Sequence, residues 1–341
     1  MKRIGSTRAW TATELAKTGA HRHTLDAASV ARLAQELPTE FQIPDTPEDA
    51  DTFRVQTGDL LNDLAAVISE KTQSYPGLAI LVGAGLENLS DGQLTAMLYG
   101  LSLILGRPVR QNHAGEYVVW VRDERPADPA SVRGYLTKDR MLLHTDAADL
   151  AGLVCLGQAA SGGASLYASA AAVHDVLTDE APELLHEYYR LWDWYVGMQQ
   201  MPGAPPVLSS PIFSFYAGEL SCRYGSYILR QGASSAGTEL TAGQLKALDL
   251  FEEVTQRPEL VLRHTLRRGE LVWMNNYRIL HGREDFKDEP GAGRARLLRR
   301  VWVWLEEHDV LAPSFGAYDY HLLGLDLTKP RGASAKADLG G

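Results

Sequence analysis

The stretch MLLHTD (Met141–Asp146) joins a short apolar run to a histidine and an aspartate two positions apart. It is one of many short apolar segments between Pro108 and Leu305, each bounded by turn residues. Segments of this length and composition are typical of strands, and a long series of them predicts an all-β barrel or sandwich decorated with helices. The other segments are VRQN, YVVWV, GLVCLGQ, ASLYAS, PIFSFY, YGSYILR, LVLRHTL, ELVWMNN and LLRRVWVWL.

A helical layer is expected before these strands. Apolar residues recur at steps of three and four between about Thr11 and Lys71, which is the spacing of an amphipathic helix. A short strand is expected over Leu78–Val82, and Ser90 has the features of a helix N-cap for a helix that runs to about Leu105. Within the strand-rich region, helices are expected over 170–177, 182–191 and 242–256.

Two segments are expected to lack regular structure. Gln199–Ser210 contains three prolines and a glycine, which indicates a long irregular loop of the kind that often forms a lid. The chain after Thr328 is rich in Gly, Ala and Lys and is expected to be disordered. With no linker and no repeat, we expect one domain over residues 1–328, with a helical layer at about 10–105, a β core at about 106–310 and a disordered tail at 329–341.

The composition is that of a globular protein that binds a small molecule. Hydrophobic residues make up 45% and charged residues 22% of the 341 residues, enough for a sizeable core. The formal net charge of -10 argues against a nucleic-acid partner, because phosphate binding needs clustered Lys and Arg. The two cysteines, Cys155 and Cys222, have no paired spacing, so neither a disulfide framework nor a thiolate zinc site is expected.

The sequence also predicts the compartment and the kind of partner. The start of the chain turns polar before an apolar run develops, and no run approaches the roughly 18 apolar residues of a membrane span. We therefore expect a cytoplasmic enzyme with a small-molecule substrate and with no nucleic-acid or membrane partner. A homo-oligomer stays open.

His144 and Asp146 are candidate metal ligands. Residues two apart on a strand point to the same side, so these two side chains are expected to project into one cavity. An imidazole and a carboxylate supply two of the three ligands of a 2-His-1-carboxylate site, which leaves three positions of an iron ion open. Taken alone, the pattern also fits a polar turn at the end of a surface strand.

A second candidate site lies on the strand predicted over Arg296–Leu305. Strand alternation places Arg296, Arg300 and Trp302 on one face of this strand. Buried arginines need an anionic partner, and a guanidinium group holds a carboxylate through two parallel hydrogen bonds. The alternative is an edge strand whose arginines are solvated above the tryptophans.

A third signal, NNYRILHGREDF (Asn275–Phe286), places His281 at the end of a short apolar segment. Together with the H-x-D of His144, the G-G-A-S of Gly162–Ser165 and the arginine strand, it resembles the TauD/TfdA (taurine/2,4-D dioxygenase) family and its clavaminate-synthase-like branch. The family pattern is H-x-D/E, then G-G-x-T/S, then N-x-R-x-x-H-x-R-x-x-F, then an arginine strand. The resemblance runs from about Gly77 to Leu305. It implies a double-stranded β-helix (jelly roll) core with an N-terminal helical layer and helical insertions.

The same resemblance implies a non-haem dioxygenase that uses Fe(II), 2-oxoglutarate as cosubstrate and O2. By similarity, His144, Asp146 and His281 are its catalytic residues and metal ligands. The carboxylate ligand argues for oxygenation rather than chlorination, because the related halogenases lack it.

The cosubstrate and substrate residues also come from the resemblance. Arg296 is implied to bind the far carboxylate of 2-oxoglutarate, with Arg294 as its rival because the preceding loop could shift the register. Ser165 stands where the family has a threonine hydroxyl that touches the cosubstrate. Arg300 and Gln111 match residues with which amino-acid-oxidising members bind the substrate carboxylate and amine.

The expected reaction is hydroxylation, or another oxidation, of an unactivated C–H bond in a small carboxylate, with decarboxylation of 2-oxoglutarate to succinate. An amino acid or a natural-product intermediate is the expected substrate, covered by the Gln199–Gln231 region. Desaturation, cyclisation, epimerisation and C–C cleavage need the same residues and stay open. A cupin-like metal-binding protein without O2 chemistry is the alternative from a different class. The remaining histidines, the His21-x-His23 pair included, are expected to be structural or solvent-exposed.

Overall fold

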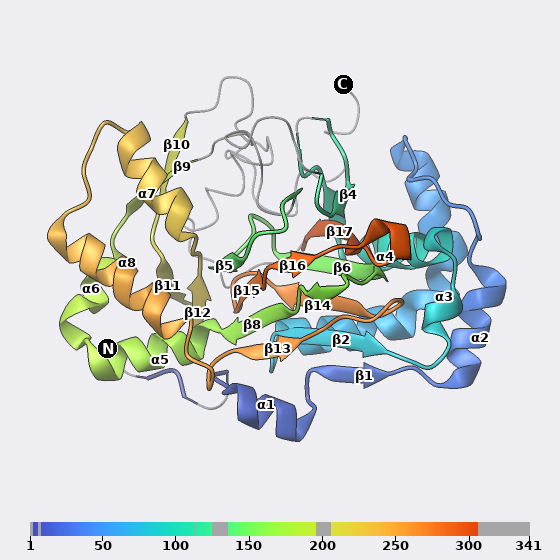
Figure 1. The fold of residues 1–341 in the computed structure, drawn as a ribbon, viewed down its shortest axis with the longest axis horizontal. Coiled ribbons are helices and arrows are strands. Elements are labelled where there is room, and N and C mark those ends of the chain that lie inside the picture. The colour runs from blue at the N-terminus through green and yellow to red at the C-terminus, as the bar shows by residue number, and fades with distance from the viewer. Residues whose placement is uncertain (1–2, 6–7, 113, 125–135, 196–205, 306–341) are drawn as a thin grey trace.

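The computed structural model describes residues 3–5, 8–112, 114–124, 136–195 and 206–305 of the chain. Its larger sheet has seven strands in the order β1–β2–β14–β6–β17–β3, with β4 also paired to β17 (Figure 1). The β1–β2 pairing is parallel and the other pairings in this sheet are antiparallel. The strands are β1 (Arg22–Thr24), β2 (Leu78–Val82), β3 (Arg107–Val109), β4 (Val118–Val121), β6 (Leu150–Gly157), β14 (Leu271–Asn275) and β17 (Leu297–Trp304).

The smaller sheet has four antiparallel strands in the order β13–β8–β15–β5. They are β13 (Leu262–His264), β8 (Ser165–Ser169), β15 (Ile279–Arg283) and β5 (Met141–His144). Three two-stranded ribbons accompany the sheets: β9 (Trp192–Tyr195) with β10 (Val207–Ser210), β11 (Phe213–Tyr216) with β12 (Glu219–Cys222), and β7 (Ser161–Gly162) with β16 (Phe286–Lys287).

The two sheets pack face to face around a buried apolar core. Ile80, Val272 and Leu298 of the larger sheet belong to the same core as Tyr167 and Ile279 of the smaller one. Inward-facing residues alternate with outward-facing ones along each strand, as a sandwich requires. This arrangement confirms the predicted double-stranded β-helix, and it confirms the predicted alternation of β17.

Helices cover the outer face of the larger sheet. Leu61 of α3 and Leu98 of α4 pack in one core with Trp273 and Val303 of the sheet (Figure 1, right). The predicted cap of α4 is confirmed, since Ser90 and Gln93 form a reciprocal capping box. These helices are α2 (Ala27–Glu36), α3 (Pro47–Gln73) and α4 (Asp91–Leu105), preceded by α1 (Ala12–Thr18).

A second group of helices covers part of the outer face of the smaller sheet. Leu177 of α5 and Phe251 of α8 share a core with Leu166 and Leu280 of that sheet (Figure 1, left). The helices are α5 (Ala170–Glu180), α6 (Leu185–Tyr189), α7 (Ser226–Ser235) and α8 (Ala242–Val254). No helix in the described part of the chain is long and apolar enough to cross a membrane.

The structure corrects three sequence expectations. The segment YGSYILR was predicted as a strand, but most of it is the first part of α7, because Ser226, Leu229 and Ala233 are buried at helical spacing. Residues 207–210 of the predicted lid loop form β10, paired with β9, while 196–205 lie outside the described residues. The N-terminal layer contains β1, which was not predicted, in addition to the predicted strand β2, and both belong to the larger sheet. The predicted tail at 329–341 also lies outside the described residues.

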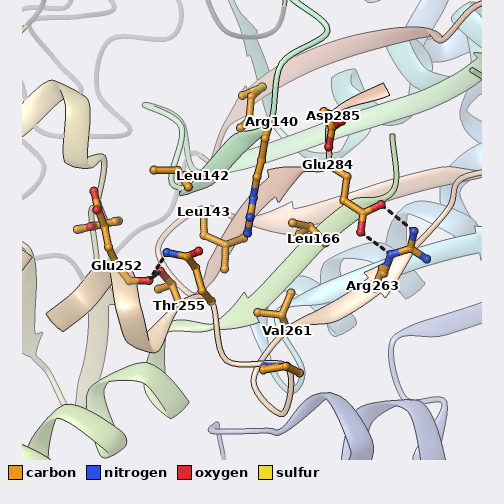
Figure 2. A pocket seen from close by; sticks show the side chains of 14 residues that line it. Arg140, Leu142, Leu143, Leu166, Glu252, Thr255, Val261, Arg263, Glu284 and Asp285 are labelled. Atoms are coloured by element: carbon orange, nitrogen blue, oxygen red, sulfur yellow. Dashed lines mark hydrogen bonds and ion pairs between the residues drawn. The ribbon is translucent and has the colours of Figure 1, made fainter. Parts of the chain in front are cut away.

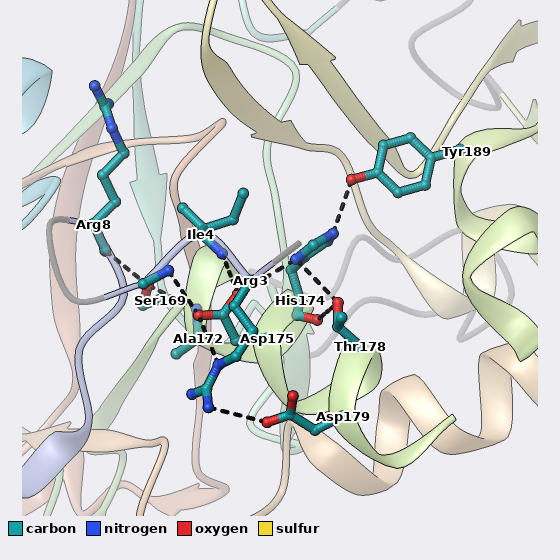
Figure 3. Close-up of polar contacts among 11 residues, drawn as sticks. Arg3, Ile4, Arg8, Ser169, Ala172, His174, Asp175, Thr178, Asp179 and Tyr189 are labelled. Atoms are coloured by element: carbon teal, nitrogen blue, oxygen red, sulfur yellow. Dashed lines mark hydrogen bonds and ion pairs between the residues drawn. The ribbon is translucent and has the colours of Figure 1, made fainter. Parts of the chain in front are cut away.

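The N-terminal segment is held against α5 by one buried carboxylate. Asp175 accepts hydrogen bonds from the backbone amides of Ile4, at 2.6 Å, and Gly5, at 2.9 Å (Figure 3). Beside it, the buried His174 ring lies 2.8 Å from the hydroxyl of Tyr189. The start of the chain is thereby fixed to a helix that follows it by about half the length of the protein.

His21 is buried immediately before β1, the first strand of the larger sheet. Only 4% of its surface is exposed, and its backbone carbonyl accepts a hydrogen bond from Ile80 of β2. Burial lowers the pKa of His21 to about 4, and the nearby charges of Arg22, His264 and Lys71 act in the same direction. The imidazole is therefore neutral in the folded protein, which fits a structural role.

We expect this histidine to make the fold sensitive to acid. Unfolded histidine binds a proton near pH 6.5, whereas folded His21 does so near pH 4, so its contribution is complete above pH 6.5 and is lost as the pH falls toward 4. Between pH 7 and pH 5 it should lower the free energy of unfolding by about 1–2 kcal/mol. The free energy of unfolding, measured by urea denaturation between pH 7 and pH 5, should fall less steeply with pH in His21→Gln than in the parent. A matched His23→Gln variant should keep the parent's slope, and equal slopes in all three proteins would contradict the prediction.

Candidate active site

Strand register brings the three predicted metal ligands together. His281 of β15 lies directly opposite His144 of β5 on one side and Tyr167 of β8 on the other. Directly paired residues share a face of the sheet, so all three side chains point into the space between the two sheets. The centroids of the two imidazole rings are 4.5 Å apart. Asp146 follows His144 by two residues and reaches the same point.

The donor atoms converge. Nε2 of His144 lies 3.9 Å from Oδ1 of Asp146, and Nε2 of His281 lies 3.5 Å from Oδ2. One ligand atom from each of the three residues lies within 4.8 Å of the others, and they are the one such group in the described part of the chain. Two imidazoles and one carboxylate at this separation suit a first-row metal ion with three open positions.

The His144 ring is oriented by its own strand. Its Nδ1 lies 2.9 Å from the backbone carbonyl of Leu142, which can only accept, so Nδ1 carries the proton and Nε2 keeps its lone pair. Burial lowers the pKa of His144 to about 4, and the neighbouring His281 adds to the effect. A neutral imidazole with a fixed tautomer is the form that binds a metal ion.

Asp146 is held as a carboxylate by two donors from β17. Nη1 of Arg300 lies 3.2 Å from Oδ2 of Asp146, and the indole Nε1 of Trp302 donates to the same oxygen at 2.9 Å. Burial alone would raise the pKa of Asp146, but Arg300 and the two histidines outweigh it and lower that pKa well below its usual range. The ionised form required of a metal ligand is therefore built into the site.

The backbone between the two ligands is also fixed. Thr145 donates its amide to the carbonyl of Tyr224 at 2.9 Å, and the Tyr224 amide donates to the Thr145 hydroxyl at 3.0 Å. The amide of Asp146 lies 3.4 Å from the side-chain oxygen of the fully buried Asn276. The H-x-D turn is thus tied to two other segments of the chain, which limits how far its ligands can move.

Arg296 lies buried at the end of β17, with 7% of its surface exposed. Its Nε lies 3.3 Å from the carbonyl of Gly163, while its Nη1 is buried and has no hydrogen-bond partner among the described residues. Gly163 has a φ of +76°, and a Cβ there would come within 3.1 Å of the Arg296 side chain, so a glycine is required. A buried cation with an unmatched donor is a fit for an anionic ligand.

A small cavity of about 40 Å³ adjoins Arg296 and is bordered by Cys155, Gly163 and Leu298. Burial lowers the pKa of Arg296, opposed in part by Cys155 and Tyr167, which places both residues near the guanidinium group. Arg294, the rival for the cosubstrate role, is different. Its side chain is 61% exposed and lies 3.9 Å from Glu289. The structure therefore favours Arg296 as the arginine that faces the interior.

Ser165 lies at the start of β8, is 8% exposed and pairs with Arg283 of β15. Arg283 is buried, and its Nη2 donates to the backbone carbonyls of Thr137 at 2.7 Å and Asp139 at 2.5 Å. Burial, followed by the like charge of Arg296, lowers the pKa of Arg283 to about 10. Phe286 lies between the two arginines, 4.8 Å from one guanidinium carbon and 5.6 Å from the other.

The predicted substrate residues Arg300 and Gln111 contact each other. Nε of Arg300 donates to Oε1 of Gln111 at 2.8 Å, and Nε2 of Gln111 donates to the backbone carbonyl of Arg300 at 3.0 Å. Both side chains are buried. The structure thus places Gln111 behind Arg300 and Arg300 against Asp146, in a layer that surrounds the ligands.

A second, larger cavity is not lined by the predicted ligands. It has a volume of about 500 Å³ and lies against Leu143, Leu166 and Val261, with the Arg263–Glu284 ion pair at its rim (Figure 2). Leu143 precedes His144 on the same strand, and consecutive strand residues point to opposite faces. The cavity is therefore on the outer side of the smaller sheet.

Sequence reasoning missed three residues of the site. Trp302 was assigned to the correct face of its strand but given no role. A buried indole N–H needs an acceptor, and this requirement could have indicated a polar partner for Trp302. Asn276 is the first residue of the N-x-R-x-x-H-x-R-x-x-F pattern but was given no role, and Tyr167 gave no pattern. Among the other histidines, His21 and His174 are buried and His186 is exposed, and none of these joins the ligand group. His113, His308 and His321 lie outside the described residues.

A jelly roll that holds two imidazoles and a carboxylate beside a buried, unmatched arginine defines a non-haem Fe(II)/2-oxoglutarate-dependent dioxygenase. The family model "Taurine catabolism dioxygenase TauD, TfdA family" matches residues 43–302. The chain belongs to this family, and the membership removes the cupin-like alternative.

Known proteins agree with this class. FR-33289 synthase of Streptomyces rubellomurinus is 34% identical over 251 residues, which are 71% of this chain and 73% of that protein. Asparagine oxygenase in complex with Fe(II), hydroxyasparagine and succinate superposes with a TM-score of 0.66 at 16% identity, covering 83% of this chain and 93% of that one. The non-heme iron oxygenase OrfP in complex with Fe and alpha-ketoglutaric acid superposes with a TM-score of 0.62 at 16% identity, covering 83% of this chain and 93% of that one. At this identity the two structures show a shared fold.

We expect His281→Ala to abolish tight metal binding, because it removes one of the three predicted ligands. Calorimetric titration of the apoprotein with Co(II) should show an affinity at least about 100-fold lower than that of the parent. The matched control is His264→Ala, since His264 lies on the same sheet but is paired with Glu270 at 2.9 Å. Parent-like affinity in His281→Ala, with a folded protein, would remove His281 from the ligand set.

Proposed function

We propose that this enzyme hydroxylates an unactivated C–H bond of a small carboxylate, an amino acid or a related natural-product intermediate, with His144, Asp146 and His281 as the iron ligands. The observation that carries the ligand assignment is the convergence of their donor atoms within 4.8 Å in the barrel interior. The β15–β5 pairing sets His281 opposite His144, and Asp146 follows in a turn that the Thr145–Tyr224 backbone contacts hold in place.

Arg296 and Ser165 are proposed to bind 2-oxoglutarate. The proposal is supported by the burial of both residues and by the unmatched Nη1 of Arg296. A guanidinium group that has lost its water gains most from a carboxylate, which can accept two parallel hydrogen bonds. Arg294 is exposed, so its guanidinium group stays hydrated and gains less from a carboxylate.

The protein residues then divide the work. Iron(II) and 2-oxoglutarate, when bound, would supply the activation of O2 that the oxidation of a C–H bond needs, with 2-oxoglutarate converted to succinate and CO2. His144, Asp146 and His281 would hold the ion through two imidazoles and one carboxylate. Arg296 orients the cosubstrate from its far end, and the two packed sheets exclude water from the reacting groups.

The amino-acid assignment rests on the neighbours and on one sequence match. Asparagine oxygenase was solved with hydroxyasparagine, and OrfP with (3S)-hydroxy-L-Arg at 17% identity and a TM-score of 0.61, so this fold accommodates amino acids. The substrate roles of Arg300 and Gln111 stay predictions. Because Arg300 already contacts Asp146 and Gln111, a substrate carboxylate would have to share its guanidinium group with them. Desaturation, cyclisation, epimerisation and C–C cleavage remain alternative outcomes of the same first steps.

Replacing Arg296 by Ala should raise the 2-oxoglutarate concentration needed for turnover by about 100-fold or more, as loss of a buried charge pair predicts. Arg294→Ala is the matched control and should leave the requirement within about twofold, because an exposed pair contributes little. The measurement is succinate formation against 2-oxoglutarate concentration. The reverse ranking of the two variants would move the role to Arg294.

The substrate class is testable without knowing the substrate. We expect one or more amino acids to perturb the absorption band of the anaerobic Fe(II)–2-oxoglutarate complex and then to couple succinate formation to a hydroxylated product. The panel should include sulfonates and aryloxy acids as competitors. Coupling with one of these and with no amino acid would overturn the substrate class and leave the enzyme class intact.

A further inference from the structure

We infer that Trp302 and Arg300 form a two-donor clamp on Oδ2 of Asp146, so that this residue offers only Oδ1 to the metal ion. Trp302 is thereby assigned as a positioning residue of the oxygenase site. The inference rests on the proposed ligand set. It assigns to β17 a task distinct from binding cosubstrate or substrate.

Both donors reach the same oxygen. The indole Nε1 of Trp302 donates to Oδ2 at 2.9 Å, and Nη1 of Arg300 lies 3.2 Å from it. A carboxylate oxygen has two lone pairs, enough for both donors. Nε2 of His281 lies farther from this oxygen, at 3.5 Å. Oδ1, which lies 3.9 Å from Nε2 of His144, keeps its lone pairs for a metal ion.

The clamp is rigid because both donors sit on the best-paired strand of the larger sheet. Within β17, Trp302 is paired with Ala151 on β6 and Val109 on β3, and Arg300 is paired with Leu153 and Val119. The two residues share one face, and the Arg300 guanidinium carbon lies 4.6 Å from the centre of the Trp302 ring. Trp302 is 3% exposed and Arg300 is 6% exposed, so both side chains are enclosed by the protein.

Gln111, in the connection between β3 and β4, extends the clamp beyond β17. Its Oε1 accepts from Nε of Arg300 at 2.8 Å, and its Nε2 donates to the carbonyls of Arg300 at 3.0 Å and Tyr117 at 2.8 Å. The amide orientation is fixed by these contacts, because the opposite orientation would point a donor at the guanidinium group. Gln111 therefore sets where Arg300 meets Asp146.

The way in which Asp146 binds decides how many coordination positions of the metal ion stay open. An aspartate that binds through both oxygens takes two positions, whereas one that binds through a single oxygen takes one. The 2-His-1-carboxylate arrangement keeps three positions open only in the second case. A cosubstrate that chelates through two atoms, together with O2, needs all three. Residues that hydrogen-bond to a metal ligand also affect metal binding, and mutating one of them typically lowers the metal affinity by about 10–100-fold.

The test compares Trp302→Phe with Trp304→Phe in the full-length apoprotein. Trp304 is on the same strand face, and its ring stands over Arg107 at 5.2 Å rather than on Asp146, so it controls for the general loss of an indole. We expect Trp302→Phe to lower the Co(II) affinity by about 10–100-fold in calorimetric titration. We also expect the d–d absorption of its Co(II) form to change in energy and intensity, because the carboxylate can now turn both oxygens toward the ion. Trp304→Phe should match the parent in both measurements.

Arg300→Gln provides a second variant in case Trp302→Phe fails to fold, and it should show the same change in Co(II) affinity without any substrate present. Thermal melting of the apo forms separates packing from positioning. A lower melting temperature in Trp302→Phe with parent-like Co(II) affinity and spectrum would overturn the clamp. Loss of Co(II) binding in His281→Ala alongside that result would leave the ligand set standing. Parent-like binding in His281→Ala would instead remove the proposed function on which the clamp rests.

Discussion

Strand β15 runs between β5 and β8, and the register of these two pairings decides where His281 lies. A shift of one residue would turn His281 to the outer face of the smaller sheet, away from His144 and Asp146. Two features hold the register. The pairing with β5 shifts between His281 and Arg283, and a Cβ on Gly282 would come within 2.6 Å of the Met141 carbonyl, so only glycine allows the two strands this close. The glycine that follows the distal histidine in the motif therefore has a geometric reason, and the ligand group depends on it.

The second constraint is the burial of arginines in a small barrel. Removing a guanidinium group from water costs several kcal/mol unless an anion or several acceptors replace the water. Arg300 is matched by Asp146, and Arg283 in part by two backbone carbonyls. Arg296 keeps a buried donor without a partner among the described residues. Arg283 also keeps two such donors, Nε and Nη1, but its Nη2 is bound to two backbone carbonyls, whereas the contact of the Arg296 guanidinium group with Gly163 is longer. Arg296 is therefore better suited than Arg283 to a ligand that carries its own negative charge.

Much of this could be predicted from the sequence, and the failures have physical causes. The inward faces of β5 and β17 follow from strand alternation, which is a local property, whereas His281 was joined to His144 and Asp146 by the family resemblance. Strand pairing is not local, so the contacts of Gln111 with Arg300 and of the Trp302 indole with Asp146 could not be predicted from strand alternation. The segment that became α7 was misjudged because its tyrosine and isoleucine favour strands, while burial at helical spacing decided the outcome.

The attachment of Ile4 and Gly5 to Asp175 bears on how the chain matures. Ile4 and Gly5 have no docking partner until α5 has been made, so this segment cannot dock while the residues between Gly5 and α5 are still being synthesised.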